Sequence, residues 1–139
     1  MKAYFDTSAL LKLLIPEAGS GTVLSVWRTA PAVAAVSVIF AEASAGLAAA
    51  RRAGRLTSAA HAESKRDLWR LWRILDVVIP VEPLCERAGA LAERQQLRGY
   101  DAVHLAAALD YGADALVSAD NDLIDAALDS GIGVVDARA

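Results

Sequence analysis

The sequence predicts an α/β fold: one domain over residues 1–139, with a central, mostly parallel β-sheet flanked by helices in a three-layer α/β/α arrangement. Two observations lead to this prediction. Short apolar segments alternate along the chain with segments of helical periodicity, which is typical of parallel strands joined by crossover helices. The chain has 139 residues, 55 % hydrophobic and 22 % charged, which suits one compact core and excludes a disordered chain.

The elements of the first half follow from apolar periodicity and from helix-ending residues. The expected order is a strand over residues 3–5, a helix that begins at Thr7 and ends before Pro16, a second helix from Pro16, a buried strand over 33–38, and a helix over 40–52 closed by Gly54. In the first helix, Leu10, Leu11 and Leu14 form one apolar stripe.

The second half continues this alternation without a repeat or a linker. Thr57 is suited to cap a long helix in which Leu68, Leu71, Trp72 and Leu75 face a core. The elements expected after it are a strand over 77–79, a helix over 83–97, a helix between Gly99 and Gly112, a strand over 115–117, a helix over 123–128 and a last strand over 133–135.

The bulk charge gives no general attraction to nucleic acid, because the net charge is −3 and the pI is about 5.3. An RNA partner would have to be held by a local basic patch or by metal ions. The candidate patches are Arg51, Arg52 and Arg55, and the pair Lys65 and Arg66. Solvated helix ends explain these patches equally well.

Few signals bear on the cellular compartment. The single cysteine, Cys85, cannot form an internal disulfide, and no apolar leader precedes Asp6, so a cytoplasmic protein is expected. Residues 30–50 have the length of a membrane span, but Pro31 interrupts them and Glu42 would be costly in lipid. We therefore expect no membrane segment.

Four acidic residues occupy one kind of position. Asp6 follows the first strand, Glu42 lies in the first turn of the helix after the second strand, Asp101 opens a helix, and Asp120 follows the fourth strand. The carboxyl ends of parallel strands meet at one edge of a sheet, so these side chains can converge on one crevice. Each acid alone is ordinary at a helix start, where the macrodipole favours negative charge, but four at one edge predict a site.

Converging carboxylates repel each other unless a cation compensates them. No set of Cys or His residues has zinc spacing, and all-oxygen ligands select Mg²⁺ or Mn²⁺, so one or two of these ions are expected. Such ions bind phosphate oxygens and activate water, which predicts phosphodiester hydrolysis. Asp6, Glu42, Asp101 and Asp120 are the expected catalytic residues and metal ligands.

Three further side chains are candidates, each with an alternative. Ser118, two residues before Asp120, can bond a carboxylate or a metal-bound water, or it can simply form the turn. Asp122 can support the bound ion directly or through water. His104 follows Asp101 by one helical turn, so a metal pair is possible, although its apolar neighbours favour a packed or base-contacting histidine.

Four segments resemble the PIN-domain family, and specifically the VapC-type toxin ribonucleases of bacterial toxin–antitoxin pairs. They are "YFDTSALLKLL" with Asp6, "SVIFAEASAGL" with Glu42, "LRGYDAVHLAAAL" with Asp101, and "LVSADNDL" with Ser118, Asp120 and Asp122. The resemblance covers essentially the whole chain, in the family's order and spacing. It departs from the family pattern at Ser118, where threonine is common.

The resemblance implies a metal-dependent endoribonuclease that acts as the toxin of such a pair. It also implies a cognate VapB-type antitoxin, whose C-terminal segment lies across the active-site groove, and a homodimer. Asp6 and Asp101 would be the primary metal ligands and Asp120 the third. Glu42 would complete the metal shell or orient the attacking water.

Other α/β modules with an acidic site fit less well. A haloacid-dehalogenase-like phosphatase expects a second aspartate two residues after the first, where this chain has Ser8. A response-regulator-like receiver needs a lysine near the final strands, and the lysines here are Lys2, Lys12 and Lys65. A PIN fold kept as a catalytically inactive binding module stays open.

Overall fold

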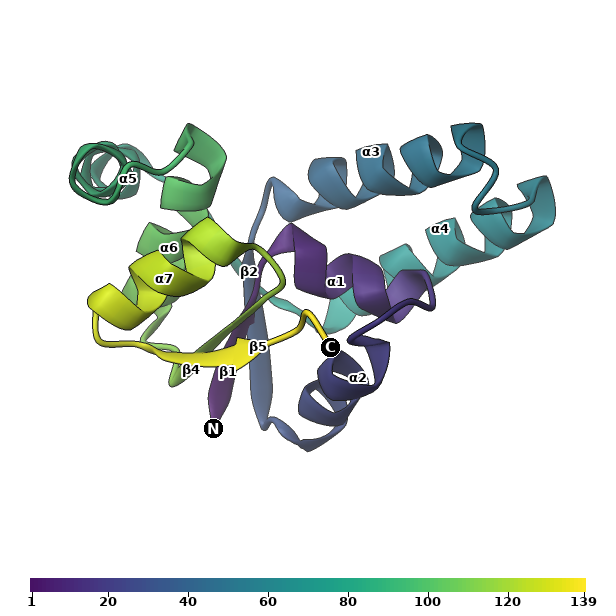
Figure 1. Ribbon diagram of the computed structural model, residues 1–139, viewed down its shortest axis with the longest axis horizontal. Coiled ribbons are helices and arrows are strands. Elements are labelled where there is room, and N and C mark those ends of the chain that lie inside the picture. Colours follow the sequence, from purple (N-terminus) through teal and green to yellow (C-terminus); the bar gives the residue numbers. More distant parts are fainter.

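The fold is built on one five-stranded sheet with seven helices, in a computed structural model that describes residues 1–139 (Figure 1). The strands are β1 (Lys2–Phe5), β2 (Ala32–Val36), β3 (Asp76–Val78), β4 (Ala115–Ser118) and β5 (Gly133–Asp136). The helices are α1 (Thr7–Leu14), α2 (Ser20–Thr29), α3 (Ile39–Arg52), α4 (Ser58–Ile74), α5 (Glu82–Gln95), α6 (Gly99–Tyr111) and α7 (Asn121–Asp129). The predicted α/β fold is confirmed.

All neighbouring strands are parallel, in the order β3-β2-β1-β4-β5, so the sheet is wholly rather than mostly parallel. β1 is the central strand. β2 and β3 lie on one side of it, and β4 and β5 lie on the other. The chain therefore leaves the ends of β1 and β4 toward opposite sides of the sheet, which opens a crevice between their carboxyl ends.

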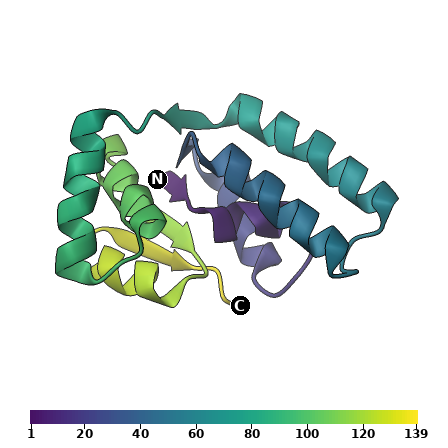
Figure 2. The same ribbon diagram turned by 90° about the horizontal axis from the view of Figure 1, so that it is seen from above.

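The two faces of the sheet are covered by different halves of the chain, as Figures 1 and 2 show. Helices α1 to α4 cover one face, where Ala3 and Phe5 of β1 point into a buried apolar cluster. Helices α5 to α7 cover the other face, where Tyr4 of the same strand points. Successive side chains of β1 thus point to opposite faces of the sheet and contribute to two separate cores, which gives the predicted three layers.

Some predicted bounds are wrong, most clearly at α2, which begins at Ser20 and not at Pro16. The chain turns between these residues, and Gly19 caps the helix with φ +89°, a left-handed conformation that favours glycine. A Cβ on Gly19 would lie 1.9 Å from the carbonyl oxygen of Ala137, so the close approach of the C-terminal tail also requires glycine at position 19.

Helices α3 and α4 form an antiparallel pair that extends beyond the sheet (Figure 2). As predicted, Thr57 caps α4, its hydroxyl accepting from the backbone N–H of Ala60 at 3.1 Å. Leu68 is buried and Trp72 packs against the core with Phe40, whose ring centroid lies 5.3 Å from that of Trp72.

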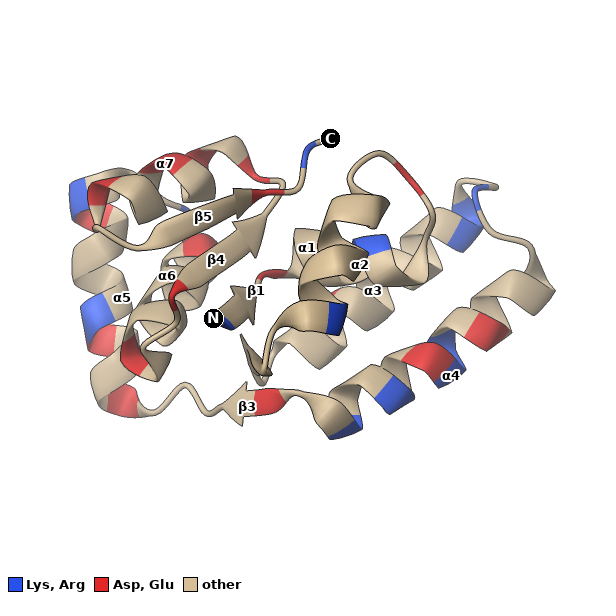
Figure 3. Ribbon diagram, turned by 90° about the horizontal axis from the view of Figure 1, so that it is seen from below, with Lys and Arg blue, Asp and Glu red and all other residues tan.

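Most Lys and Arg residues of this half belong to α4 and to the far end of α3, as Figure 3 shows. None of the seven helices combines the length and the apolar character that a bilayer crossing requires.

Candidate functional site

The four predicted acids converge at the crevice between the carboxyl ends of β1 and β4. There they line a cavity of about 190 Å³, which we call the acid pocket, and no hydrophobic side chain lines it. Its residues are Asp6, Thr7, Ser8, Glu42, Arg98, Asp101, His104 and Asp120. Residues more than 110 positions apart in the chain thus meet because their strands end at one edge of the sheet.

Asp6 is the deepest of the four acids, with only 4 % of its surface exposed. As N-cap of α1, its Oδ1 accepts from the backbone N–H of Ala9 at 2.9 Å and from the Ser8 hydroxyl at 2.7 Å. Its Oδ2 accepts from the Ser118 hydroxyl at 2.6 Å. Burial raises the pKa of the Asp6 carboxyl above its usual value, although these three donors favour the charged form.

Ser118 therefore acts on a carboxylate, and the carboxylate is that of Asp6. The hydroxyl is fully buried at the end of β4 and also accepts from the backbone N–H of Asp120 at 3.0 Å. One serine thus ties the end of β1 to the start of α7. Asp122 lies one residue inside α7, is exposed, and is not among the residues that line the acid pocket.

Glu42 is held by a chain of hydrogen bonds that crosses the sheet. Its Oε1 accepts from the Thr7 hydroxyl at 2.8 Å and from His104 Nε2 at 2.9 Å. The Tyr4 hydroxyl lies 2.8 Å from His104 Nδ1 and accepts from the backbone N–H of Val36. Because a carboxylate can only accept, His104 Nε2 carries a proton and donates it to Glu42, while Nδ1 faces the Tyr4 hydroxyl.

His104 is therefore a packed histidine, only 2 % exposed, that orients a carboxylate. Burial acts to raise the pKa of Glu42, but the bonds from His104 and Thr7 outweigh it and the pKa is lowered. Glu42 is consequently ionised at neutral pH and fixed in one orientation.

Asp101 and Asp120 form the outer side of the acid pocket. Asp120 is the N-cap of α7, with Oδ1 accepting from the backbone N–H of Leu123 at 3.0 Å. Burial, followed by the neighbouring charge of Asp120, raises the pKa of Asp101. Arg98 contacts both acids: its Nε lies 3.1 Å from Asp101 Oδ2 and its Nη2 lies 3.3 Å from Asp120 Oδ2.

The donor set fits a hard divalent ion, because every acid in the pocket offers carboxylate oxygen and none offers sulfur. The arrangement, however, does not group three acidic or histidine side chains closely enough to hold an ion. In this conformation Arg98 contacts two of the carboxylates, and hydroxyl groups and His104 contact the other two.

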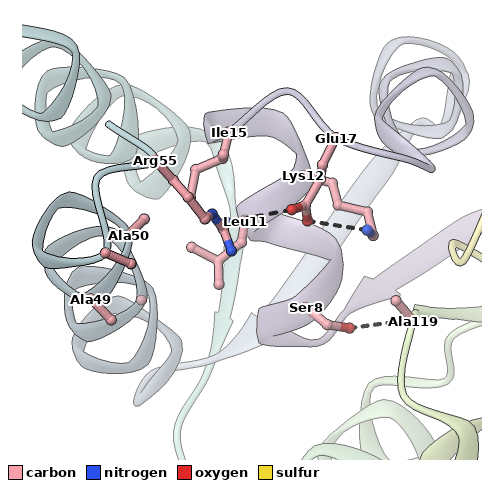
Figure 4. A pocket seen from close by; sticks show the side chains of 11 residues that line it. Ser8, Leu11, Lys12, Ile15, Glu17, Ala49, Ala50, Arg55 and Ala119 are labelled. Atoms are coloured by element: carbon pink, nitrogen blue, oxygen red, sulfur yellow. Dashed lines mark hydrogen bonds and ion pairs between the residues drawn. The ribbon is translucent and has the colours of Figure 1, made fainter. Parts of the chain in front are cut away.

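A larger cavity of about 510 Å³ lies beside the acid pocket and shares Ser8 with it. Figure 4 shows its small and apolar side chains from α1 and α3, among them Leu11, Ala49 and Ala50. At its rim Glu17 pairs with Lys12 at 3.1 Å and with Arg55 at 3.5 Å. Of the predicted Arg51, Arg52 and Arg55 patch, Arg55 alone lines this cavity, and none lines the acid pocket.

Two residues of the site were not predicted from the sequence, Arg98 and Tyr4. Arg98 stands three residues before Asp101, a spacing at which opposite charges meet across a helix start, and this signal could have found it. Tyr4 alternates with Phe5 in a buried strand, and a buried tyrosine hydroxyl needs a partner. The identity of that partner depends on how α6 packs.

Comparisons with known proteins show which family this chain resembles. The PIN domain model matches residues 3–128. Ribonuclease VapC49 of Mycobacterium tuberculosis (strain ATCC 25618 / H37Rv) is 40 % identical over 119 residues, which are 84 % of this chain and 81 % of that protein.

Two solved structures share the fold. Mycobacterium tuberculosis VapC20, a sarcin–ricin loop cleaving toxin, has a TM-score of 0.69 and 23 % identity, covering 89 % of this chain and 94 % of that one. A toxin–antitoxin complex from Klebsiella pneumoniae has a TM-score of 0.68 and 21 % identity, covering 96 % and 95 %. With its family match, its VapC relative and four acids at one sheet edge, this chain belongs to the PIN-domain family, in its VapC-type group.

Proposed function

We propose that this protein is an endoribonuclease that hydrolyses RNA phosphodiester bonds at the acid pocket with Mg²⁺ or Mn²⁺, as the toxin of a toxin–antitoxin pair. The observation that carries the proposal is the convergence of Asp6, Glu42, Asp101 and Asp120 in one wholly polar pocket. The name of the relative VapC49, a ribonuclease, supports the choice of RNA as substrate.

In this proposal Asp6, Asp101 and Asp120 hold the ion or ions, and Asp122 supports Asp120 from the first turn of α7. A bound ion would make a water more acidic and would stabilise charge on the phosphate oxygens. Ser8 and Ser118 keep both oxygens of Asp6 in a fixed orientation. Glu42, ionised and held by His104, accepts a hydrogen bond from the attacking water and so orients it.

The substrate we propose is a single strand or a loop, in which the bases are not paired. Unstacked bases can be splayed out in such a strand. The neighbouring cavity, with apolar walls and Lys12 and Arg55 at its rim, is placed to take the nucleotide next to the cut phosphate. The partners of the proposal are a cognate VapB-type antitoxin and a second copy of this chain.

A phosphatase of the haloacid-dehalogenase type is disfavoured by the same geometry. That chemistry needs Asp6 as a free nucleophile beside a second carboxylate. Instead, both oxygens of Asp6 accept hydrogen bonds, and Ser8, which stands in the place of the second acid, is one of the donors. No lysine lines the acid pocket.

The test is RNA cleavage by purified, antitoxin-free protein with Mg²⁺ or Mn²⁺, beside EDTA and beside Asp6→Asn. Cleavage that needs the ion and disappears in Asp6→Asn is the expected result. An exposed acid outside the site, Asp129→Asn, is the matched control and should cut like the wild type. Folded wild-type protein that cuts no RNA with either ion would instead support an inactive binding module.

The two partner proposals have separate tests. Co-purification with a small protein encoded beside this one would support the antitoxin, and expression alone without harm to the host would contradict it. Light scattering at micromolar concentration decides the homodimer, and a monomer there would contradict it.

A further inference from the structure

Arg98 is the only lysine or arginine among the residues that line the acid pocket. It is the N-cap residue of α6, and its guanidinium reaches from Asp101 of that helix to Asp120 at the start of α7. The Arg98 side chain is 78 % exposed, whereas that of Asp101 is 14 % exposed. A solvent-facing cation thus lies over two partly buried carboxylates from different helices.

The oxygens that Arg98 contacts belong to two of the three acids proposed to hold the ion. Its Nε and Nη2 lie 3.1 Å and 3.3 Å from the Oδ2 atoms of Asp101 and Asp120. A guanidinium and a divalent ion beside the same oxygens repel each other, so binding of one weakens binding of the other. Asp6 and Glu42 differ, because no lysine or arginine contacts either of them.

The Arg98 side chain can also move away from Asp101 and Asp120 without breaking other contacts. It makes no hydrogen bond or ion pair other than those to Asp101 and Asp120. Solvent-exposed ion pairs contribute little to stability, so breaking these two does not threaten the fold. Once released, a planar guanidinium with five donors matches the oxygens of a phosphate group and can bind two of them at once.

We propose that Arg98 is a displaceable counter-ion of the acid pocket: it holds Asp101 and Asp120 in the metal-free protein, gives them up to the divalent ion, and then binds a phosphate of the RNA. This inference rests on the proposed function. It makes Arg98 weaken metal binding and strengthen RNA binding, two opposite effects that a merely structural ion pair would not produce.

The first measurement is Mn²⁺ binding to the RNA-free protein by calorimetry. Arg98→Gln should bind Mn²⁺ about tenfold more tightly, which is the order expected when one positive charge is removed from about 5 Å away in a water-like dielectric. Arg98→Lys should stay near the wild type because it keeps the charge. Arg94→Gln, an exposed arginine of α5 that forms no ion pair, is the matched control and should show no change.

The second measurement is RNA cleavage by the same variants at saturating Mn²⁺. Arg98→Gln should raise KM and lower kcat/KM by roughly 10- to 100-fold, the size of one or two lost charge-assisted hydrogen bonds. The kcat/KM of Arg98→Lys should lie between those of the wild type and Arg98→Gln, because an ammonium keeps the charge but cannot bind two phosphate oxygens in the bidentate geometry of a guanidinium. Circular dichroism and the melting temperature verify that each variant is folded.

An unchanged Mn²⁺ affinity in Arg98→Gln would overturn the counter-ion role, and an unchanged kcat/KM at saturating Mn²⁺ would overturn the phosphate contact. Neither result would contradict the proposed nuclease function of the wild-type protein. A wild-type protein that neither binds Mn²⁺ nor cuts RNA is a different failure, since it removes the proposed function itself.

Discussion

At the residue scale, Asp6 affects stability in two opposite ways, because it caps α1 and also carries a buried charge. Asparagine keeps the cap and removes the charge, whereas alanine removes both. Asp6→Asn should therefore be more stable than Asp6→Ala by about 1–2 kcal/mol, the cost of a lost cap and of partners left unbonded. Urea denaturation of both variants in metal-free buffer measures the difference. Equal stabilities would show that the Asp6 cap contributes nothing.

The raised pKa of Asp6 also sets a pH dependence. The folded protein binds a proton here more tightly than the unfolded chain does, so stability falls as pH rises from the unfolded pKa through the folded one. The Asp6→Asn variant has no carboxyl group at this position, so its stability does not fall with pH for this reason. Its advantage over the wild type in metal-free buffer should be absent near pH 3 and should grow toward neutral pH. Melting temperatures across this range test it, and an advantage that shrinks as pH rises would contradict it.

Tyr4 and His104 show how a residue of the core can serve the site. Tyr4→Phe leaves His104 Nδ1 and the backbone N–H of Val36 without their partner, which should cost about 1–3 kcal/mol. It also removes the hydrogen-bond partner of His104 Nδ1, whereas the Glu42 carboxylate, which can only accept, keeps the Nε2–H in place. Nitrogen-15 NMR of the imidazole should therefore show a shifted Nδ1 resonance and an unchanged Nε2–H. Tyr100→Phe, at an exposed tyrosine, is the control and should change neither quantity.

At the scale of the elements, the start of α2 depends on one glycine. Gly19 has a left-handed φ, and a Cβ there would collide with the backbone of Ala137. Gly19→Ala should cost more than about 1 kcal/mol. Gly21→Ala, two residues on in the same helix with open space around its Cα, should be neutral or stabilising. Denaturant midpoints compare the two variants, and equal effects would remove the special role of Gly19.

Most elements could be predicted because apolar spacing is a local property, and all seven helices and five strands appear in the predicted order. The start of α2 could not be predicted, because it depends on Gly19, which lies against the C-terminal tail, more than a hundred residues away in the chain. The acids of the site could be predicted because strand ends fix their place. The i, i+3 spacing could have revealed the contact of Arg98 with Asp101. The contact of Arg98 with Asp120 and the Tyr4–His104 pair could not be predicted, since they depend on how α6 packs on the sheet and against α7.

At the scale of the whole molecule, an acidic protein must bind RNA through local charge. The net charge is −3, and Arg51 and Arg52 stand at the far end of α3 (Figure 3). Replacing both with glutamine in the Asp6→Asn background, which keeps the RNA intact, should weaken binding. It should also reduce the slope of log affinity against log salt by about 1–2.

The control for this prediction lies on the other face of the molecule. Arg87 of α5 is ion-paired with Asp110, so Arg87→Gln should leave both the affinity and the slope unchanged. Equal slopes for the double variant and the wild type would place the RNA away from the tip of α3.

The division of the two sheet faces between the two halves of the chain also governs when the site exists. Asp6 and Glu42 are made with the first half, and Asp101 and Asp120 arrive only with the second. During translation, a nascent chain therefore carries half a site until α6 and α7 have left the ribosome and folded onto the sheet. For most of its own synthesis, the chain thus lacks two of the four acids that line the acid pocket, and a product truncated before α6 lacks them permanently.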